Sequence, residues 1–136
     1  MRIFILLLLM HFFELTKPLN IYILQLVKNK YYIGKTSNNV LFRFNQHVNG
    51  NGAKWTMIFK PVKIIEHFET FDKFDEDKYT KKYMDIYGID NVRGGSYTKV
   101  VLDNWQIKAL EYEFRTANNL CFICGKSGHF ASGCKL

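Results

Sequence analysis

Residues 21–47 constrain the fold of this chain more than any other stretch, because two short apolar runs flank a polar turn. Residues 21–27 are mostly Ile, Leu and Val, and residues 31–33 are two tyrosines and an isoleucine. Runs of this composition, separated by a short polar segment, predict an antiparallel hairpin. Lys28-Asn29-Lys30 is the expected turn, and Gly34 is the expected end of the second strand.

A helix is expected directly after this hairpin. Apolar residues recur on one side of a helical pattern from residue 40 to residue 48, and Ser37 or Asn38 is the expected N-cap. Arg43 and His47 are four residues apart on this helix, so they share a face. Two tyrosines on a hairpin beside an arginine and a histidine on a helix form an arrangement that suits a phosphate group.

These residues resemble the GIY-YIG nuclease domain. The resemblance rests on Ile21-Tyr22, on Tyr32-Ile33-Gly34, and on Arg43 and His47 after them. In that family the two motifs lie on neighbouring strands and the arginine lies on the following helix. This chain departs from the first motif, because Asn20 stands where the leading glycine belongs. The stretch Gly52-Ala53-Lys54-Trp55-Thr56 also resembles the middle of the family, and the resemblance covers about residues 20–95.

The resemblance implies a set of residues for phosphodiester hydrolysis. In the family an arginine steadies the phosphate, tyrosines and a histidine position or activate water, and a glutamate holds one divalent metal ion. The implied catalytic residues are Tyr22, Tyr32, Gly34, Arg43, His47 and Glu76.

The glutamate of this set departs from the family pattern. Thr80 occupies the matching position, whereas Glu76 lies one turn earlier on the same face and Asp77 is close to it. A hydroxyl is a weaker ligand for Mg²⁺ or Mn²⁺ than a carboxylate. If neither Glu76 nor Asp77 serves, the fold keeps a phosphate-binding surface without metal-dependent cleavage.

The fold class expected from these elements is α+β, with a small three-stranded antiparallel sheet flanked by helices and a zinc knuckle at the C-terminal end. The third strand is expected at residues 57–68, which contain β-branched residues. A helix is expected at residues 75–87, because its acidic first turn and later lysines complement the helix dipole. Gly88 is its expected end, and its expected buried stripe is Tyr79, Tyr83 and Ile86, with Met84.

A further helix is expected at residues 103–118, with Asp103 as its cap. Its expected packing face contains Trp105, Ala109 and Tyr112, with Ile107, Leu110 and Phe114 beside them. The resulting division of the chain is an apolar extension at 1–18, a GIY-YIG-like domain at 19–98, a helical spacer at 99–118 and a zinc knuckle at 119–136.

The apolar run at residues 1–13 resembles the apolar region of a signal peptide but lacks the other features of that signal. No small residues follow it as a signal-peptide cleavage site, and it is shorter than the ~20 residues that span a bilayer. Three interpretations stay open: a weak membrane anchor, a helix packed on the domain, or an extension outside the functional core. We expect the third, and no membrane partner.

The last sixteen residues contain all three cysteines, in the pattern C-x2-C-x4-H-x4-C. Three thiolates and one imidazole make a closed tetrahedral zinc site, and the ligands are Cys121, Cys124, His129 and Cys134. Bound Zn²⁺ would have a structural role, because so short a segment cannot bury a core of its own. The pattern resembles the CCHC zinc knuckle, which implies binding of single-stranded nucleic acid through Phe122 and Phe130. A structural zinc site with a protein partner is the alternative.

The formal charge of +7 and the pI of about 9.3 favour nucleic acid as the partner. Three functions stay open. Two of them involve nucleic acid: a metal-dependent endonuclease that uses Mg²⁺ or Mn²⁺, and a nucleic-acid-binding protein built on a degenerate nuclease fold. A zinc-bearing protein adaptor is a third. We expect DNA rather than RNA, single-stranded or branched.

Three cysteines leave one over in a disulfide scheme, so we expect a reducing, intracellular compartment. The combination of this domain with a knuckle resembles proteins of large DNA viruses, including giant viruses. A viral origin would place the protein in the nucleus or cytoplasm of an infected cell.

Overall fold

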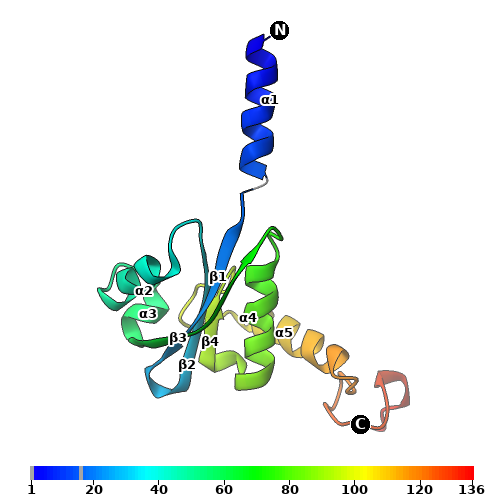
Figure 1. Ribbon diagram of the computed structural model, residues 1–136. Helices are drawn as coiled ribbons and strands as arrows, with labels where there is room; N and C mark the ends of the chain where they lie inside the picture. The colour runs from blue at the N-terminus through cyan, green and yellow to red at the C-terminus, as the bar shows by residue number, and fades with distance from the viewer. Residues whose placement is uncertain (1, 16) are drawn as a thin grey trace.

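In the computed structural model, which describes residues 2–15 and 17–136, a four-stranded sheet forms the centre of the domain (Figure 1). β1 pairs antiparallel with both β2 and β3, whereas β2 pairs parallel with β4. The α+β class is therefore confirmed, but the prediction of a three-stranded antiparallel sheet is wrong. The order across the sheet is β3-β1-β2-β4, and the strands are β1 (Leu19–Leu26), β2 (Lys30–Thr36), β3 (Pro61–Thr70) and β4 (Val92–Gly94).

The additional strand, β4, is too short to give a periodic signal in the sequence, because it contains three residues. Its long-range contacts hold it in place. Arg93 is buried, and its guanidinium lies 4.7 Å from the ring centroid of Trp55. The same side chain donates hydrogen bonds to four backbone carbonyls, those of Ile89, Val92, Lys99 and Val100.

The β1–β2 hairpin and its turn are confirmed, but the predicted end of the second strand at Gly34 is wrong, because β2 stays paired with β1 as far as Thr36. Lys28 and Asn29 have left-handed φ angles of 58° and 54°, as a tight turn between twisted strands requires. The register places Tyr22 of β1 directly opposite Gly34 of β2. The two motifs of the resemblance therefore face each other across one strand pair.

The third strand begins four residues later than predicted, because residues Lys54–Ile58 form the short helix α3. Two of its side chains, Trp55 and Thr56, are buried, and their contacts override the local strand tendency. Pro61 then opens β3, a position that tolerates proline because the first residue of a strand can lack an N–H donor.

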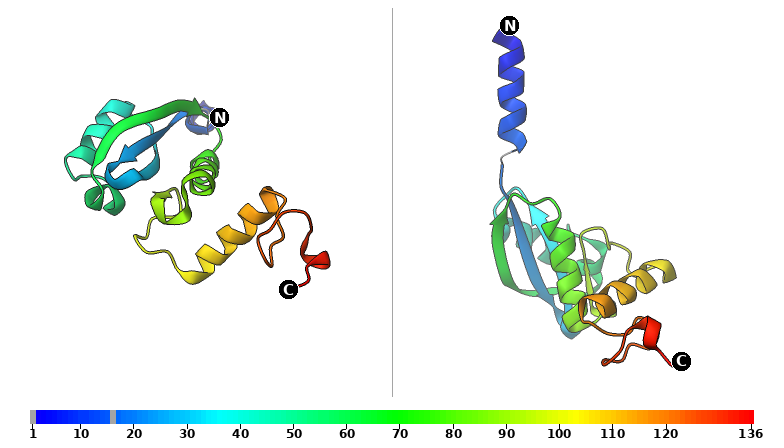
Figure 2. Two further views of the ribbon diagram at one scale, coloured as in Figure 1. Left: turned by 90° about the horizontal axis from the view of Figure 1, so that it is seen from below. Right: turned by 90° about the vertical axis from the view of Figure 1, so that its right-hand side faces the viewer.

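Helices cover both faces of the sheet (Figure 2). Alternate residues of each strand point to opposite faces, so the sheet has two apolar cores. Helices α2 (Val40–Val48) and α3 lie on one face, and α4 (Asp75–Tyr87) and α5 (Asn104–Ala117) lie on the other. The first core comprises Tyr22, Leu24, Leu26, Val40 and Trp55. The second comprises Ile21, Ile23, Tyr31, Ile33, Met84, Val92, Leu102 and Leu110.

Helix α4 spans the predicted range and ends at Gly88, which has a φ of 98°. Met84 is buried and both Tyr79 and Tyr83 pack against the core, as predicted. Ile86 was predicted to be buried but is 69% exposed. It follows Met84 by two residues, which places it on the opposite side of the helix.

Helix α5 begins with the predicted cap, because Asp103 forms a capping box with Gln106. Its packing face differs from the prediction. Leu110 is buried and Ile107 and Phe114 pack against the core, whereas Trp105 and Tyr112 are exposed. The stripe at 107, 110 and 114 lies about half a turn from the stripe at 105 and 112, so only one of them faces α4 and the sheet.

Helix α1 (Arg2–Leu15) extends away from the domain (Figure 1). Its apolar side chains from Ile3 to Met10 are exposed, and the side chains of residues 11–16 lie outside the described part. No helix among the described residues combines the length and the apolar character needed to cross a membrane. The division of the chain at residue 18 stays a prediction. Three short 3-10 helices complete the structure: η1 (Val27–Asn29), η2 (Ile89–Asn91) and η3 (Ala131–Gly133).

Candidate active site and metal cluster

A chain of hydrogen bonds joins β1, α2 and α3 through four side chains. The Nε of Arg43 donates to the hydroxyl oxygen of Tyr22 at 3.3 Å, and that oxygen lies 2.9 Å from Nε2 of His47. On the other side of the imidazole, Nδ1 lies 2.8 Å from Oγ1 of Thr56. His47 and Thr56 are fully buried and Tyr22 is nearly so, which excludes bulk water from these bonds.

The direction of proton donation along this chain follows from its far end. The hydroxyl of Thr56 donates to the carbonyl oxygen of Ala53 at 2.8 Å, and a carbonyl can only accept. The Thr56 oxygen therefore accepts from the Nδ1–H of His47, which leaves Nε2 as the acceptor of the neutral ring. The hydroxyl of Tyr22 must then donate to His47, while its oxygen accepts from Arg43.

Helix α2 positions the two members of this chain that were predicted to share a face. Its cap is Asn39, whose side-chain oxygen accepts from the backbone N–H groups of Leu41 and Phe42 at 2.8 and 3.3 Å. The predicted caps, Ser37 and Asn38, are therefore wrong, because the chain turns into the helix one residue later. Arg43 is further oriented by its Nη1, which donates to the side-chain oxygen of Gln46 at 2.9 Å.

The absence of a side chain at two glycines makes room for the Tyr22 and His47 side chains. A Cβ at Gly34 would lie 2.3 Å from the Tyr22 hydroxyl oxygen, and a Cβ at Gly52 would lie 2.0 Å from Nδ1 of His47. Both distances are far below van der Waals contact, and both side chains are buried. The glycine of the second motif is thus required by the tyrosine of the first.

Burial and charge hold the pair in a neutral form. Burial, together with the positive charge of Arg43, lowers the pKa of His47 to about 4. Burial raises the pKa of Tyr22 above its ordinary value, although the hydrogen bond and charge of Arg43 act in the opposite direction. At neutral pH the imidazole is therefore uncharged and the phenol keeps its proton.

Tyr32 completes the group of rings on this face of the sheet. Its ring centroid lies 5.1 Å from that of His47 and 6.4 Å from that of Tyr22. Burial raises the pKa of Tyr32 strongly, and the nearby Tyr22 adds to this. The structure thus brings together Tyr22, Tyr32, Gly34, Arg43 and His47 from three elements.

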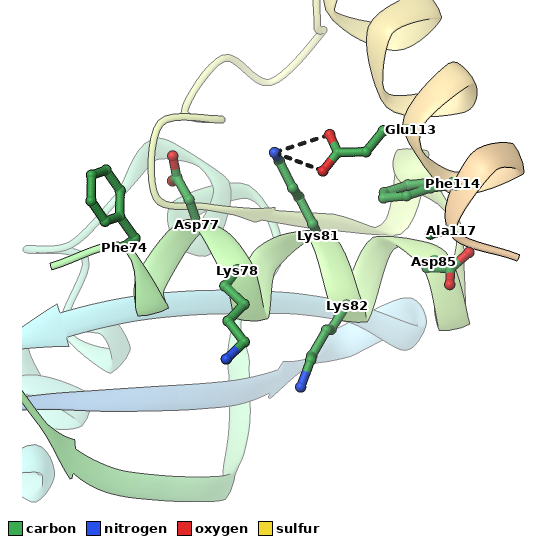
Figure 3. A pocket seen from close by; sticks show the side chains of 9 residues that line it. All are labelled: Phe74, Asp77, Lys78, Lys81, Lys82, Asp85, Glu113, Phe114 and Ala117. Carbon is green, nitrogen blue, oxygen red and sulfur yellow. Dashed lines mark hydrogen bonds and ion pairs between the residues drawn. The ribbon is translucent and has the colours of Figure 1, made fainter. Parts of the chain in front are cut away.

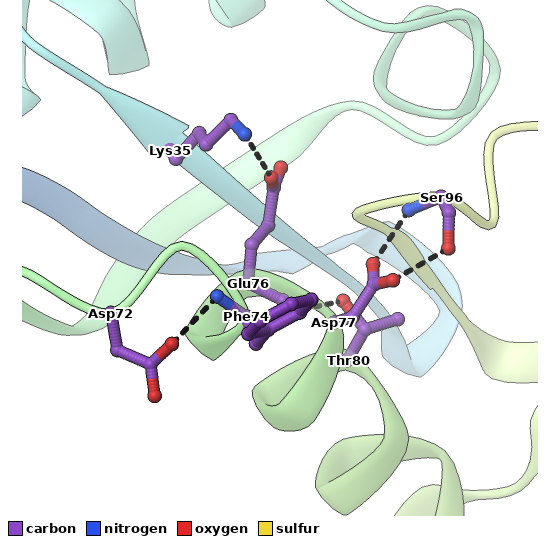
Figure 4. A network of polar contacts seen from close by, with 7 residues as sticks. All are labelled: Lys35, Asp72, Phe74, Glu76, Asp77, Thr80 and Ser96. Atoms are coloured by element: carbon purple, nitrogen blue, oxygen red, sulfur yellow. Dashed lines mark hydrogen bonds and ion pairs between the residues drawn. The ribbon is translucent and has the colours of Figure 1, made fainter.

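Glu76 extends from the first turn of α4 toward β2 (Figure 4). Its carboxylate lies 3.4 Å from the ammonium nitrogen of Lys35, and its side chain is 16% exposed. Burial raises the pKa of this carboxyl, although Lys35 and the backbone N–H of Gly95 act in the opposite direction. The charge of Glu76 also raises the pKa of both Tyr22 and Tyr32, so the carboxylate acts electrostatically on the group of rings.

Asp77, the alternative carboxylate, and Thr80, the residue at the expected position of the family's glutamate, both have other hydrogen-bond partners (Figure 4). Asp77 accepts from the backbone N–H and from the hydroxyl of Ser96, both at 2.7 Å. Thr80 is fully buried, and its hydroxyl donates to the carbonyl oxygen of Glu76 at 2.7 Å. Among these residues, Glu76 is therefore the carboxylate that can hold a hard divalent cation, which proteins bind through one or two carboxylates together with substrate phosphate.

A separate groove lies between α4 and α5 (Figure 3) and has a volume of about 430 Å³. Three lysines and three acidic residues line it, and Lys81 forms an ion pair with Glu113 at 3.0 Å. Its formal charges balance, with three lysines and three carboxylates among the lining residues. The acidic lining residues are Asp77, Asp85 and Glu113, and the lysines are Lys78, Lys81 and Lys82.

The predicted zinc ligands lie together at the C-terminal end. One ligand atom from each of Cys121, Cys124, His129 and Cys134 lies within 4.8 Å of all the others, and Cys124 Sγ is 3.3 Å from His129 Nε2. Ligands at ~2.3 Å around one tetrahedral ion are separated by roughly 3.5–4 Å, so the cluster fits zinc. Gly125 and Gly128 have φ angles of 75° and 94°, which allow the loop to turn between the ligands.

Sequence reasoning missed the part that Thr56 and Gly52 play in the site. Both lie in the stretch Gly52-Ala53-Lys54-Trp55-Thr56, which was noted only as part of the resemblance. Threonine and glycine are common residue types that do not by themselves indicate a catalytic role. Their importance comes from contacts with His47, which the sequence does not show.

A comparison with protein families matches the GIY-YIG catalytic domain to residues 18–87. No curated protein and no solved structure gives a significant match. The expected similarity to giant-virus proteins is therefore not supported by these comparisons. The matched segment covers just over half of the chain and includes both tyrosine motifs, Arg43, His47 and α4. The chain belongs to the GIY-YIG catalytic domain family.

Proposed function

We propose that this protein is a metal-dependent endonuclease that hydrolyses phosphodiester bonds in DNA. The observation that carries the proposal is the directed hydrogen-bond chain from Arg43 through Tyr22 and His47 to Thr56. It provides a cation for the phosphate and a neutral imidazole whose lone pair already accepts the proton of a phenol. Such a relay is suited to proton transfer from an attacking water.

Substrate binding would raise the pKa of His47 and so favour proton transfer along this relay. The charge of Arg43 contributes to the low pKa of His47. A phosphodiester anion beside Arg43 offsets that charge and therefore raises the pKa of His47, although burial, the larger cause of its low pKa, remains. The Tyr22 hydroxyl can then pass its proton to His47 as it accepts one from water, so His47 becomes a stronger base when the phosphate is present.

Glu76 would hold a Mg²⁺ or Mn²⁺ ion at this site. Such an ion supplies charge relief to the phosphate oxygens and helps the leaving oxygen depart. The Lys35 side chain is 49% exposed, so its ammonium group can move from the carboxylate into solvent while the metal ion takes its place beside Glu76.

The C-terminal cluster would bind a structural Zn²⁺ and contribute to substrate binding. We infer single-stranded or branched DNA as the substrate class, from the resemblance of the cluster to a CCHC knuckle and from the net charge of +7. Three thiolate ligands are stable in a reducing environment, so we place the protein inside a cell. In an infected cell this would be the nucleus or the cytoplasm.

A cleavage assay with the zinc-loaded full chain tests the proposal. Single-stranded, duplex and branched DNA, and RNA, are incubated with Mg²⁺, Mn²⁺ or EDTA. We expect cleavage of DNA that requires the divalent metal and is lost in Arg43→Ala and Tyr22→Phe. Lys63→Ala, which removes an exposed positive charge from β3, is the matched control and should cleave normally. Cleavage that persists in EDTA or in Arg43→Ala would refute the proposed site.

A second function, binding of nucleic acid by a degenerate nuclease fold, is favoured by one observation. Glu76 is paired with Lys35 at 3.4 Å, and the resemblance places the neutral Thr80 where the family has its metal-binding glutamate. This function predicts salt-sensitive binding without cleavage in any metal. It also predicts that Glu76→Gln leaves binding unchanged, whereas the endonuclease loses its cleavage in the same variant.

A further inference from the structure

The outer face of α5 presents aromatic rings to solvent. Trp105 is 69% exposed and Tyr112 is 54% exposed. They are seven residues apart, so at about 100° per residue they point the same way and lie about 10 Å apart along the helix axis. The opposite face of α5 contains Leu110, Ile107 and Phe114, which make its contacts with the core. The exposed rings are therefore not needed to pack the helix.

This aromatic face continues into the zinc-binding loop. The ring of Tyr112 lies 5.0 Å from the ring of Phe122, which follows the first cysteine of the cluster. Arg115, also on α5, donates to the carbonyl oxygen of Phe122 at 2.9 Å and to that of Ile123 at 3.5 Å. The loop is thus attached to the helix by hydrogen bonds as well as by the two rings, and its exposed Phe122 extends the row begun on α5.

The chemistry of this surface fits single-stranded nucleic acid. Exposed aromatic rings stack with unpaired bases, whereas duplex DNA keeps its bases inside. Lys108 is exposed between Trp105 and Tyr112, at three and four residues from them, where it can pair with a backbone phosphate. Trp105 and Tyr112 stand singly on the helix with Lys108 between them, whereas the core of a protein interface is depleted of charged residues, lysine included.

We propose that Trp105 and Tyr112 of α5, together with Phe122, form one base-stacking surface for a single-stranded segment of nucleic acid. The inference rests on the proposed function for the class of substrate. It adds Trp105 and Tyr112, which lie outside both the matched domain and the cysteine cluster, to the position of Phe122 that the knuckle resemblance already implies. The strand would run along α5, with successive unpaired bases on Trp105, Tyr112 and Phe122 and with Lys108 on the backbone.

The fluorescence of Trp105 can report binding directly. The chain contains two tryptophans, and Trp55 is 4% exposed. Titration of the zinc-loaded full chain with oligothymidine should quench the fluorescence of Trp105 by stacking and leave Trp55 unaffected. Trp105→Phe should bind with similar affinity but without the quenching. Trp105→Ala and Tyr112→Ala should each raise the Kd, measured by anisotropy of a labelled oligonucleotide, by between about five- and a hundredfold. Duplex DNA of equal length should show a smaller change.

The matched control is Phe71→Ala, which removes a ring that is 72% exposed between β3 and α4. It should leave the Kd unchanged, and zinc content and far-UV circular dichroism should be the same in all variants. Unchanged binding in the Trp105→Ala, Tyr112→Ala double variant would overturn the proposal. Light scattering gives a second test. If the wild type is a dimer, and the double variant is a monomer that still binds the oligonucleotide, the face is a protein interface and the proposal is refuted. Failure of cleavage in every metal would refute the endonuclease but leave this binding result unaffected.

Discussion

Replacement of Thr56 by valine tests the direction of the hydrogen-bond chain. Valine has nearly the same shape as threonine, so it leaves no cavity, but it removes the oxygen that accepts from His47 Nδ1–H at 2.8 Å. Both residues are fully buried, so water cannot replace that oxygen. An unsatisfied buried donor costs about 1–3 kcal/mol. Urea unfolding should therefore show a loss of this size, and Tm should fall by roughly 3–5 °C per kcal/mol for a chain of this length.

The tautomer of His47 is the sharper readout, because many core substitutions lower stability. In ¹⁵N-resolved NMR spectra at pH 7, wild-type His47 should carry its proton on Nδ1. Thr56→Ser keeps the hydroxyl and should keep this tautomer, at a cost of about 1 kcal/mol for the lost methyl group. Thr56→Val should shift the proton toward Nε2. Where cleavage is measured, its rate should fall by about a hundredfold, since Nε2 can then no longer accept the proton of Tyr22.

Either of two results would refute this reasoning. A wild-type His47 protonated on Nε2 would reverse the direction assigned to every bond in the chain. A Thr56→Val variant with the stability of the wild type and an unchanged tautomer would show that the contact between Thr56 and His47 does not control the ring.

Three further perturbations follow from the structure. His47 has a pKa of about 4 in the folded protein, so only the unfolded state gains its proton between pH 6.5 and 4. Stability should fall by about 3 kcal/mol over that window, and His47→Gln should lose this part of the pH dependence in urea titrations. Removal of zinc by a chelator should abolish hydrogen-exchange protection in residues 119–136 and preserve it in β1 and β2, because Cys121 is the one buried residue of the loop. Gly34→Ala should cost about 1–3 kcal/mol in unfolding free energy by displacing Tyr22, whereas Gly133→Ala, whose new Cβ would lie 3.9 Å from its nearest neighbour, should cost less.

Elements with strong local signals were predictable from the sequence. The hairpin turn at Lys28-Asn29 and the helix α4 follow from turn composition, charge distribution and a terminal glycine, all of which lie within the element. The pattern of the four zinc ligands is similarly local, and the structure places all four together. In each case residues close together in the sequence determine the conformation, so the local sequence is sufficient to predict it.

Features that depend on distant residues could not be predicted. Strand β4 exists because Arg93 is held by carbonyls of the surrounding loops and stacks on Trp55, far away in the sequence. The prediction of the packing face of α5 was wrong because the helix has two apolar stripes. Only the position of α4 and the sheet determines which of the two stripes is buried. The role of Thr56 depends on its meeting His47 across two helices. A periodic pattern predicts where helices and strands lie, but the distant residues that they contact are determined by the fold.

The two candidate functions differ in what Glu76 does, and its surroundings distinguish it from Thr80. Thr80 has no exposure, and its hydroxyl is committed to the carbonyl of Glu76 within the same helix, so it cannot turn toward a metal ion without breaking that bond. Glu76 instead faces the half-exposed Lys35 near the C-terminal end of β2, and a divalent cation can replace this ammonium group as the partner of the carboxylate. The displaced ammonium would remain close by, where it can pair with the incoming phosphate. The carboxylate of Glu76, one turn before Thr80, is therefore the one whose charge reaches the rings around His47, and the outcome of Glu76→Gln decides between the enzyme and the binding protein.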